Sequence, residues 1–159
     1  MYNHCVALLK ERGVELVDIA ECVMYLQKAY IKDITIEKCL VEIDSVLCKR
    51  EVQNAITTGI YMDKQAEKHL IDDKCLSDLM LNDASLFGID EVLAYGICNL
   101  YGSIALTNYG YIDKVKPLIV GKLNKDHSIC NTFLDDIVGA IAASASSKIA
   151  HNAVKKNEN

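Results

Sequence analysis

The chain has 159 residues, of which 51% are hydrophobic and 25% are charged, and its formal net charge is −5. A chain of this length can bury a sizeable core as one domain. Its acidic balance, without a basic stripe, argues against nucleic acid as a main partner. The seven cysteines are odd in number and form no C-x-x-C pair, which favours free thiols and a cytoplasmic, reducing location.

Apolar residues recur at helical spacing along nearly the whole chain, and the period-two alternation of strands is nearly absent. Ile36, Leu40 and Ile43, for example, follow the i, i+4, i+7 pattern. We therefore predict an all-α, single-domain helical bundle over residues 1–159, with a buried central helix and a tail that frays from about residue 152. The predicted helices span residues 2–12, 15–30, 35–48, 50–68, 72–81, 86–107, 117–124 and 132–154.

The predicted helices 86–107 and 132–154 are the most apolar and should be central. The stretch from Val92 to Ile112 is long enough to span a bilayer, but its asparagine, tyrosine and glycine residues favour burial in protein. We expect no transmembrane span and at most peripheral contact with the inner face of a membrane. The small residues from Gly139 to Ser146 allow a neighbouring helix to approach closely. Both helices are candidates for self-association, so we expect a homo-oligomer.

Two acidic pairs, Asp90-Glu91 and Asp135-Asp136, precede these apolar helices with no basic residue within a helical turn. One interpretation is helix capping, because the first turn of a helix attracts acids and Thr132-x-x-Asp135 resembles a capping box. The other is a divalent metal site, because Mg²⁺ prefers oxygen ligands and helical bundles build such sites from facing acids. Adjacent side chains on a helix diverge by about 100°, so one acid of each pair can face the metal.

Between the pairs, Lys116 precedes the only proline, Pro117. The residue before proline favours an extended backbone, and proline suits the first position of a helix. Lys116 is therefore expected at a helix N-terminus, where anions are favoured, after a loop that holds Asp113 and Lys114. This arrangement is either a plain helix start with solvated lysines or, together with the acidic pairs, a metal-plus-phosphate site.

Three motifs in order, "IDEVLAYGI", "NYGYIDKVKP" and "NTFLDDIVGAIAA", resemble the phosphatidylglycerophosphatase A family, most closely its soluble, helical bacterial branch. The family pattern is an apolar-Asp-Glu motif, an Asp-x-x-Lys-Pro motif and an apolar-Asp-Asp-apolar motif. The close match covers residues 86–150, and the resemblance extends back through residues 49–67.

The resemblance implies a Mg²⁺-dependent phosphatase that converts phosphatidylglycerophosphate to phosphatidylglycerol, or acts on a related phosphate ester such as a phospholipid headgroup. Mn²⁺ or Ca²⁺ could substitute for Mg²⁺. Asp136 is the candidate general base, Lys116 and Lys114 are the candidate phosphate-binding residues, and Asp113 would fix Lys116 or reach the metal site. The candidate metal ligands are the four acids of the two pairs, Asp90, Glu91, Asp135 and Asp136.

A non-catalytic alternative stays open, in which the chain is a helical oligomer or a ligand-binding module that retains an acidic metal site. It depends on two departures from the membrane-bound members of the family. Gly110 stands where those members have an arginine, and "DHSICNTF" replaces their glycine-rich turn before the Asp-Asp motif.

Overall fold

The computed structural model describes residues 1–157, and this part of the chain forms nine helices and no strand. The all-α class predicted from the apolar spacing is therefore confirmed. The helices are α1 (Tyr2–Glu11), α2 (Leu16–Gln27), α3 (Ile36–Leu47), α4 (Arg50–Glu67), α5 (Lys74–Leu81), α6 (Ile89–Asn99), α7 (Ser103–Val115), α8 (Leu118–Lys125) and α9 (Leu134–Asn157).

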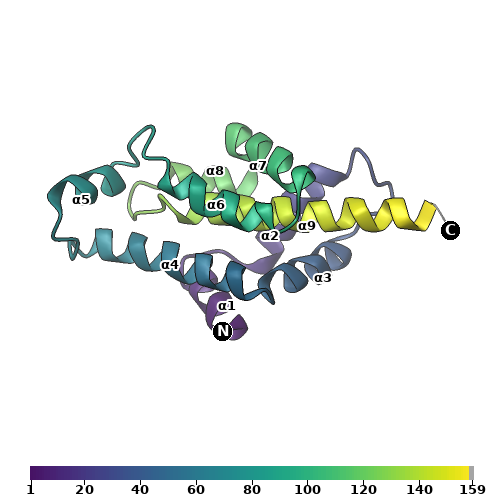
Figure 1. Cartoon of the computed structure of the whole chain (residues 1–159), viewed down its shortest axis with the longest axis horizontal. Coiled ribbons are helices and arrows are strands. Elements are labelled where there is room, and N and C mark those ends of the chain that lie inside the picture. Colours follow the sequence, from purple (N-terminus) through teal and green to yellow (C-terminus); the bar gives the residue numbers. More distant parts are fainter. Residues whose placement is uncertain (158–159) are drawn as a thin grey trace.

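Helix α9 is the centre of the bundle, as predicted for residues 132–154. It runs along the long axis of the molecule (Figure 1) and packs against α2, α3, α4, α6, α7 and α8. Every residue from Leu134 to Ser147 is buried, because neighbours cover all sides of this half of the helix. Its small residues allow this packing. A Cβ added to Gly139 would lie 3.3 Å from the side chain of Ile112 on α7.

The prediction of one central helix over residues 86–107 is wrong, because the chain breaks there into α6 and α7. Gly102 precedes α7 with φ of 82°, a conformation that suits glycine and ends the preceding helical run. The break is held to the central helix, since Ser147 Oγ donates a hydrogen bond to the Tyr101 carbonyl at 2.9 Å. Because α7 continues to Val115, Asp113 and Lys114 lie on a helix and not on the predicted loop.

Helix α6 is also less buried than its composition predicts. It packs against α4, α7 and α9 on one side, while Ile89, Val92 and Tyr95 remain exposed on the other. No helix within residues 1–157 is both long and apolar enough to cross a membrane.

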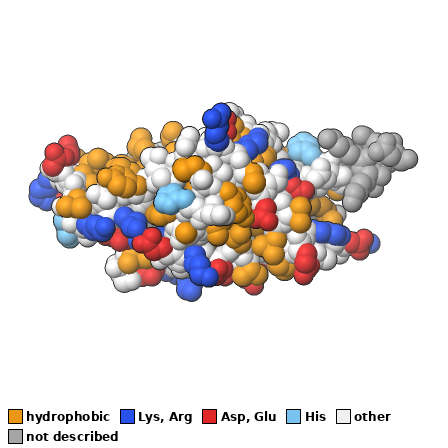
Figure 2. Space-filling view, turned by 90° about the horizontal axis from the view of Figure 1, so that it is seen from below, with side chains coloured by type: hydrophobic (Ala, Val, Ile, Leu, Met, Phe, Trp, Pro, Cys, Tyr) orange, Lys and Arg blue, Asp and Glu red, His pale blue; other side chains and the backbone are white. Residues whose placement is uncertain are grey.

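The end of the chain is helical for longer than predicted. Residues 152–157 continue α9, while residues 158–159 lie outside the described part. Contacts with α3 explain part of this, because Asn152 Nδ2 donates to Glu42 Oε1 at 2.9 Å and Lys148 pairs with Glu42 at 3.2 Å. The face shown in Figure 2 carries interspersed basic and acidic side chains among the hydrophobic ones.

Candidate functional site

A cavity of about 360 Å³ lies where the first turns of α6 and α9 meet the end of α7 and the loop of residues 83–88. It collects six of the seven predicted site residues, all except Lys114, which is exposed and lies outside the lining. The charged residues in the lining are six carboxylates and one lysine: Asp83, Asp90, Glu91, Asp113, Asp135, Asp136 and Lys116.

Three of these carboxylates converge. Asp90, Glu91 and Asp136 each offer one oxygen atom, and the three atoms lie within 4.8 Å of one another. Glu91 Oε2 is buried without a hydrogen-bond partner, which is uncommon because buried polar atoms are normally paired. Oxygen ligands from acids on two facing helices fit a divalent cation such as Mg²⁺. Asp135, the fourth predicted ligand, does not belong to this group.

Asp135 instead faces the lysine of the cavity. Lys116 Nζ lies 2.8 Å from Asp135 Oδ2, 2.8 Å from Asp113 Oδ1 and 3.6 Å from Asp136 Oδ1. Burial lowers the pKa of Lys116, but these carboxylates more than offset it and the net shift of the pKa is upward. The ammonium group therefore stays charged, which a phosphate-binding group requires.

Three buried acids of the cavity, Asp90, Asp135 and Asp136, resist ionisation. Burial and the neighbouring Asp135 carboxylate raise the pKa of Asp136 to about 8, against the opposing effect of Lys116. Burial and the neighbouring Glu91 carboxylate raise the pKa of Asp90 to about 7. Burial also raises the pKa of Asp135, but only to about 6, because Lys116 opposes it. A bound cation would reverse these shifts, since a nearby positive charge favours the carboxylate form.

Lys116 reaches the cavity from an unexpected backbone conformation. The predicted extended geometry is wrong, because Lys116 ends α7 in the left-handed region with φ of 47° and ψ of 57°. Pro117 precedes α8 as its N-cap and is not its first residue. The Lys116 carbonyl points at Gly121, where a Cβ would collide with it. A left-handed, non-glycine residue costs about 1–3 kcal/mol and is most common at functional sites.

The start of α9 is capped differently from the Thr132-x-x-Asp135 box that the sequence resembles. Thr132 Oγ1 donates to the Met80 carbonyl at 2.6 Å and so does not cap the helix. Asp63 of α4 takes that role, because its carboxylate accepts the N–H groups of Phe133 and Leu134, each at 3.0 Å. The acids of α9 therefore remain free to face the cavity.

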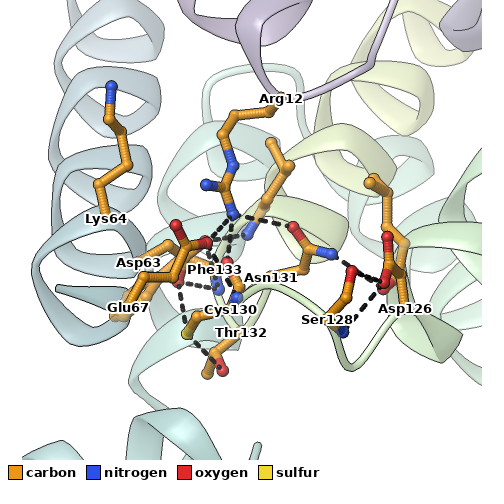
Figure 3. Close-up of polar contacts among 12 residues, drawn as sticks. Arg12, Asp63, Lys64, Glu67, Asp126, Ser128, Cys130, Asn131, Thr132 and Phe133 are labelled. Carbon is orange, nitrogen blue, oxygen red and sulfur yellow. Dashed lines mark hydrogen bonds and ion pairs between the residues drawn. The ribbon is translucent and has the colours of Figure 1, made fainter. Parts of the chain in front are cut away.

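The segment before α9 belongs to a buried network (Figure 3). Arg12 Nη2 donates to the Cys130 carbonyl at 2.5 Å and to Asn131 Oδ1 at 3.2 Å. It also pairs with Glu67 Oε1 at 2.5 Å, and that same oxygen accepts the Cys130 N–H at 2.9 Å. The network connects the segment that precedes α9 to the end of α1 and to α4.

The sequence interpretation missed Asp63 and Tyr109. A signal for Asp63 was present, because Ile56, Ile60 and Asp63 follow i, i+4, i+7 and so place an acid on the core face of α4. Tyr109 is buried, and its hydroxyl has no hydrogen-bond partner. Burial and the Asp136 carboxylate raise the pKa of Tyr109, so its hydroxyl stays protonated beside the acids.

Comparisons with known proteins identify relatives of this chain. The uncharacterized protein YutG of Bacillus subtilis (strain 168) is 57% identical over 148 residues, which cover 92% of this chain and 89% of that protein. A solved structure of a protein of unknown function from Bacillus stearothermophilus has a TM-score of 0.92 at 52% identity, covering 96% of this chain and 95% of that one. The crystal structure of the low temperature requirement C protein from Listeria monocytogenes has a TM-score of 0.91 at 51% identity, covering 95% of each chain.

A family model described as phosphatidylglycerophosphatase A matches residues 10–151. The matched range extends well beyond the three motifs. It also covers Arg12, Asp63 and Glu67, which contact the segment before α9. This protein therefore belongs to the phosphatidylglycerophosphatase A family.

Proposed function

We propose that this protein is a Mg²⁺-dependent phosphatase that hydrolyses a phosphomonoester, either phosphatidylglycerophosphate to phosphatidylglycerol or a related ester. The observation that carries the proposal is the cavity that joins three converging carboxylates to a charged lysine. Oxygens of Asp90, Glu91 and Asp136 lie within 4.8 Å of one another, and Lys116 Nζ lies 3.6 Å from Asp136. A divalent cation would offset the charge of the carboxylates and, together with Lys116, would supply the positive charge that binds a phosphate. The lipid substrate is suggested by the family.

In this proposal, the cation is held by the converging acids, and Mn²⁺ or Ca²⁺ could replace Mg²⁺. When bound, the cation supplies positive charge to the phosphate oxygens and to the leaving oxygen. Lys116 binds a phosphate oxygen as a point charge. Asp113 and Asp135 hold its ammonium group in place, each at 2.8 Å.

Asp136 has a second part in the proposal, because it is the general base that accepts a proton from the attacking water. Its position suits this role, since it is the acid shared by the metal group and the lysine contacts. Lys114 has no part, because it lies outside the cavity.

Phosphate release by the purified protein tests the proposal. We expect Mg²⁺ to support release from phosphatidylglycerophosphate in detergent micelles or from a small phosphomonoester, and EDTA to abolish it. Asp136→Asn should lower kcat by about 100-fold or more. Asp72→Asn is the matched control, because it removes an exposed acid outside the cavity lining, and it should keep full activity.

The same assay separates the competing functions. Release that persists in EDTA and in Asp136→Asn would contradict the proposal. Mn²⁺ binding without turnover of any ester would instead identify a non-catalytic ligand-binding module. A preference for micellar lipid over soluble esters would assign the lipid substrate, and the reverse preference would assign a soluble one.

A further inference from the structure

We infer that Asp63 is a positioning residue for the acidic cavity, because it fixes the first turn of α9, on which Asp135 and Asp136 stand. The inference rests on the proposed function, in which Asp136 holds a divalent cation. Asp63 lies on α4, is fully buried and does not line the cavity. It therefore acts on the site through the backbone of α9 and not by touching a ligand.

The contacts of Asp63 suit this role. Its Oδ1 accepts the N–H of Phe133 at 3.0 Å and its Oδ2 accepts that of Leu134 at 3.0 Å. These are among the N–H groups that a helix cannot pair within itself. Two consecutive amides held by one carboxylate fix both the position and the rotation of the helix start. Since adjacent side chains diverge by about 100°, this rotation decides which acid meets the metal group and which meets Lys116.

The same contacts have a consequence for substrate binding. A helix N-terminus normally attracts anions, including phosphate. At α9 that place is already taken by the Asp63 carboxylate, with Arg12 close enough to oppose the rise of its pKa. The N–H groups of Phe133 and Leu134 are therefore not available to a phosphate. On the proposed function, the positive charge that the phosphate meets comes from Lys116 and the cation.

Mn²⁺ affinity, measured by electron paramagnetic resonance, tests the inference without relying on turnover. Asp63→Asn keeps one acceptor oxygen but cannot hold both amides as a carboxylate does. We expect it to weaken Mn²⁺ binding by about 10-fold or more, as changes behind metal ligands commonly do. The matched control is Glu67→Gln, which removes a carboxylate from the same network but touches no N–H of α9. Its Mn²⁺ affinity should stay within about twofold of wild type.

A purely structural role would lower the thermal stability of both variants without separating their Mn²⁺ affinities, and this result would overturn the inference. Unchanged Mn²⁺ affinity in a folded Asp63→Asn variant would also overturn it, while leaving the proposed function intact. If the wild-type protein bound no Mn²⁺, the proposed function and the positioning role would both fail.

Amide hydrogen exchange of the wild-type protein, followed by NMR, tests the anchoring even if Asp63→Asn does not fold. The control is Ala105, a fully buried residue in the first turn of α7, which has no side-chain cap. We expect the amides of Phe133 and Leu134 to exchange at least about 10-fold more slowly than that of Ala105. Equal exchange would show that Asp63 does not pin the start of α9.

Discussion

The first turn of α9 lies between two clusters of acids that differ in how their charge is balanced. On one side, Asp63 accepts two backbone N–H groups and Glu67 pairs with Arg12. On the other, the cavity holds six carboxylates and one lysine, and an oxygen of Glu91 is buried without a partner. Burial raises the pKa of Asp63 to about 7 and that of Asp136 to about 8, so each cluster contains an acid that resists ionisation.

The neighbours make the difference. For Asp63, the N–H of Phe133 and the charge of Arg12 oppose the effect of burial on the pKa. For Asp136, the carboxylates of Asp135 and Asp90 add to the effect of burial. A buried charge is tolerated when it is paired and hydrogen-bonded. The first cluster is balanced within the chain, whereas on the proposed function a cation balances the second.

The largest effect should follow from removing the cation of the balanced cluster. Arg12→Ala leaves Glu67, the Cys130 carbonyl and the Asn131 side-chain oxygen without their buried partner, and should lower the free energy of unfolding by about 3–5 kcal/mol. Urea unfolding monitored by circular dichroism measures this loss. Lys10→Ala, which breaks the exposed pair with Glu15, should change stability by less than about 1 kcal/mol. Similar effects of both variants would show that the buried contacts of Arg12 contribute no more to stability than an exposed ion pair.

The unbalanced cluster should reveal itself through pH. Asp135, Asp90 and Asp136 have pKa values of about 6, 7 and 8 in the folded protein, against about 4 in an unfolded chain. Between about pH 4 and 8 the folded state therefore binds more protons, and metal-free stability should fall by roughly 1.4 kcal/mol per pH unit for each such proton. Above pH 8 the loss should level off.

Urea titrations in EDTA at several pH values measure this slope. Saturating Mg²⁺ should make it shallower because a cation favours the ionised acids, and should leave the contribution of Asp63, which has a pKa of about 7 and lies outside the cavity. A metal-free stability that rises with pH through this window would contradict the assignment of unbalanced acids.

Displacing Lys116, the one basic residue in the cavity lining, should lower the stability of the protein. Gly121→Ala places a Cβ against the Lys116 carbonyl, and such overpacking should destabilise the protein by about 1–3 kcal/mol. Gly96→Ala is the matched control, because its Cβ would meet no atom within 4 Å, and alanine in an open helix position should stabilise by about 0.5–1 kcal/mol. Thermal unfolding compares the two. If Gly121→Ala is as stable as Gly96→Ala, the left-handed Lys116 is not held by this contact.

The smallest expected change in stability is that of Asp136→Asn, and its sign should be opposite to that of Asp135→Asn. At pH 9 in EDTA, Asp136→Asn should stabilise the protein by about 0.5–2 kcal/mol, because functional groups are often held at the expense of stability. Asp135→Asn should instead destabilise it by about 1–3 kcal/mol, because it weakens a buried partner of Lys116. Urea unfolding of the two variants compares adjacent acids in one turn. The same sign for both would remove the distinction between them.

Several parts of the fold followed from local patterns. Gly13 with φ of 78° follows α1, and Thr35 Oγ1 accepts the N–H of Lys38 at the start of α3. The helical period also indicated the buried α9, since its small and apolar residues continue on every face. The break at Gly102 was missed because apolar composition continues across it. The exposed face of α6 was missed because composition does not tell which side of a helix has neighbours.

The chemistry of the cavity was visible in adjacent acids and in a lysine before proline, because these patterns depend only on neighbours in sequence. The sequence did not show which of the adjacent acids joins the converging carboxylates and which contacts Lys116. Asp135 and Asp136 face different partners, and the start of α9 that carries them is bound by Asp63, about seventy residues earlier. Gly121 leaves room for the carbonyl of the left-handed Lys116. Helical period and acidic pairs are local properties of a chain, whereas the partner that balances a buried charge is set by packing between distant segments.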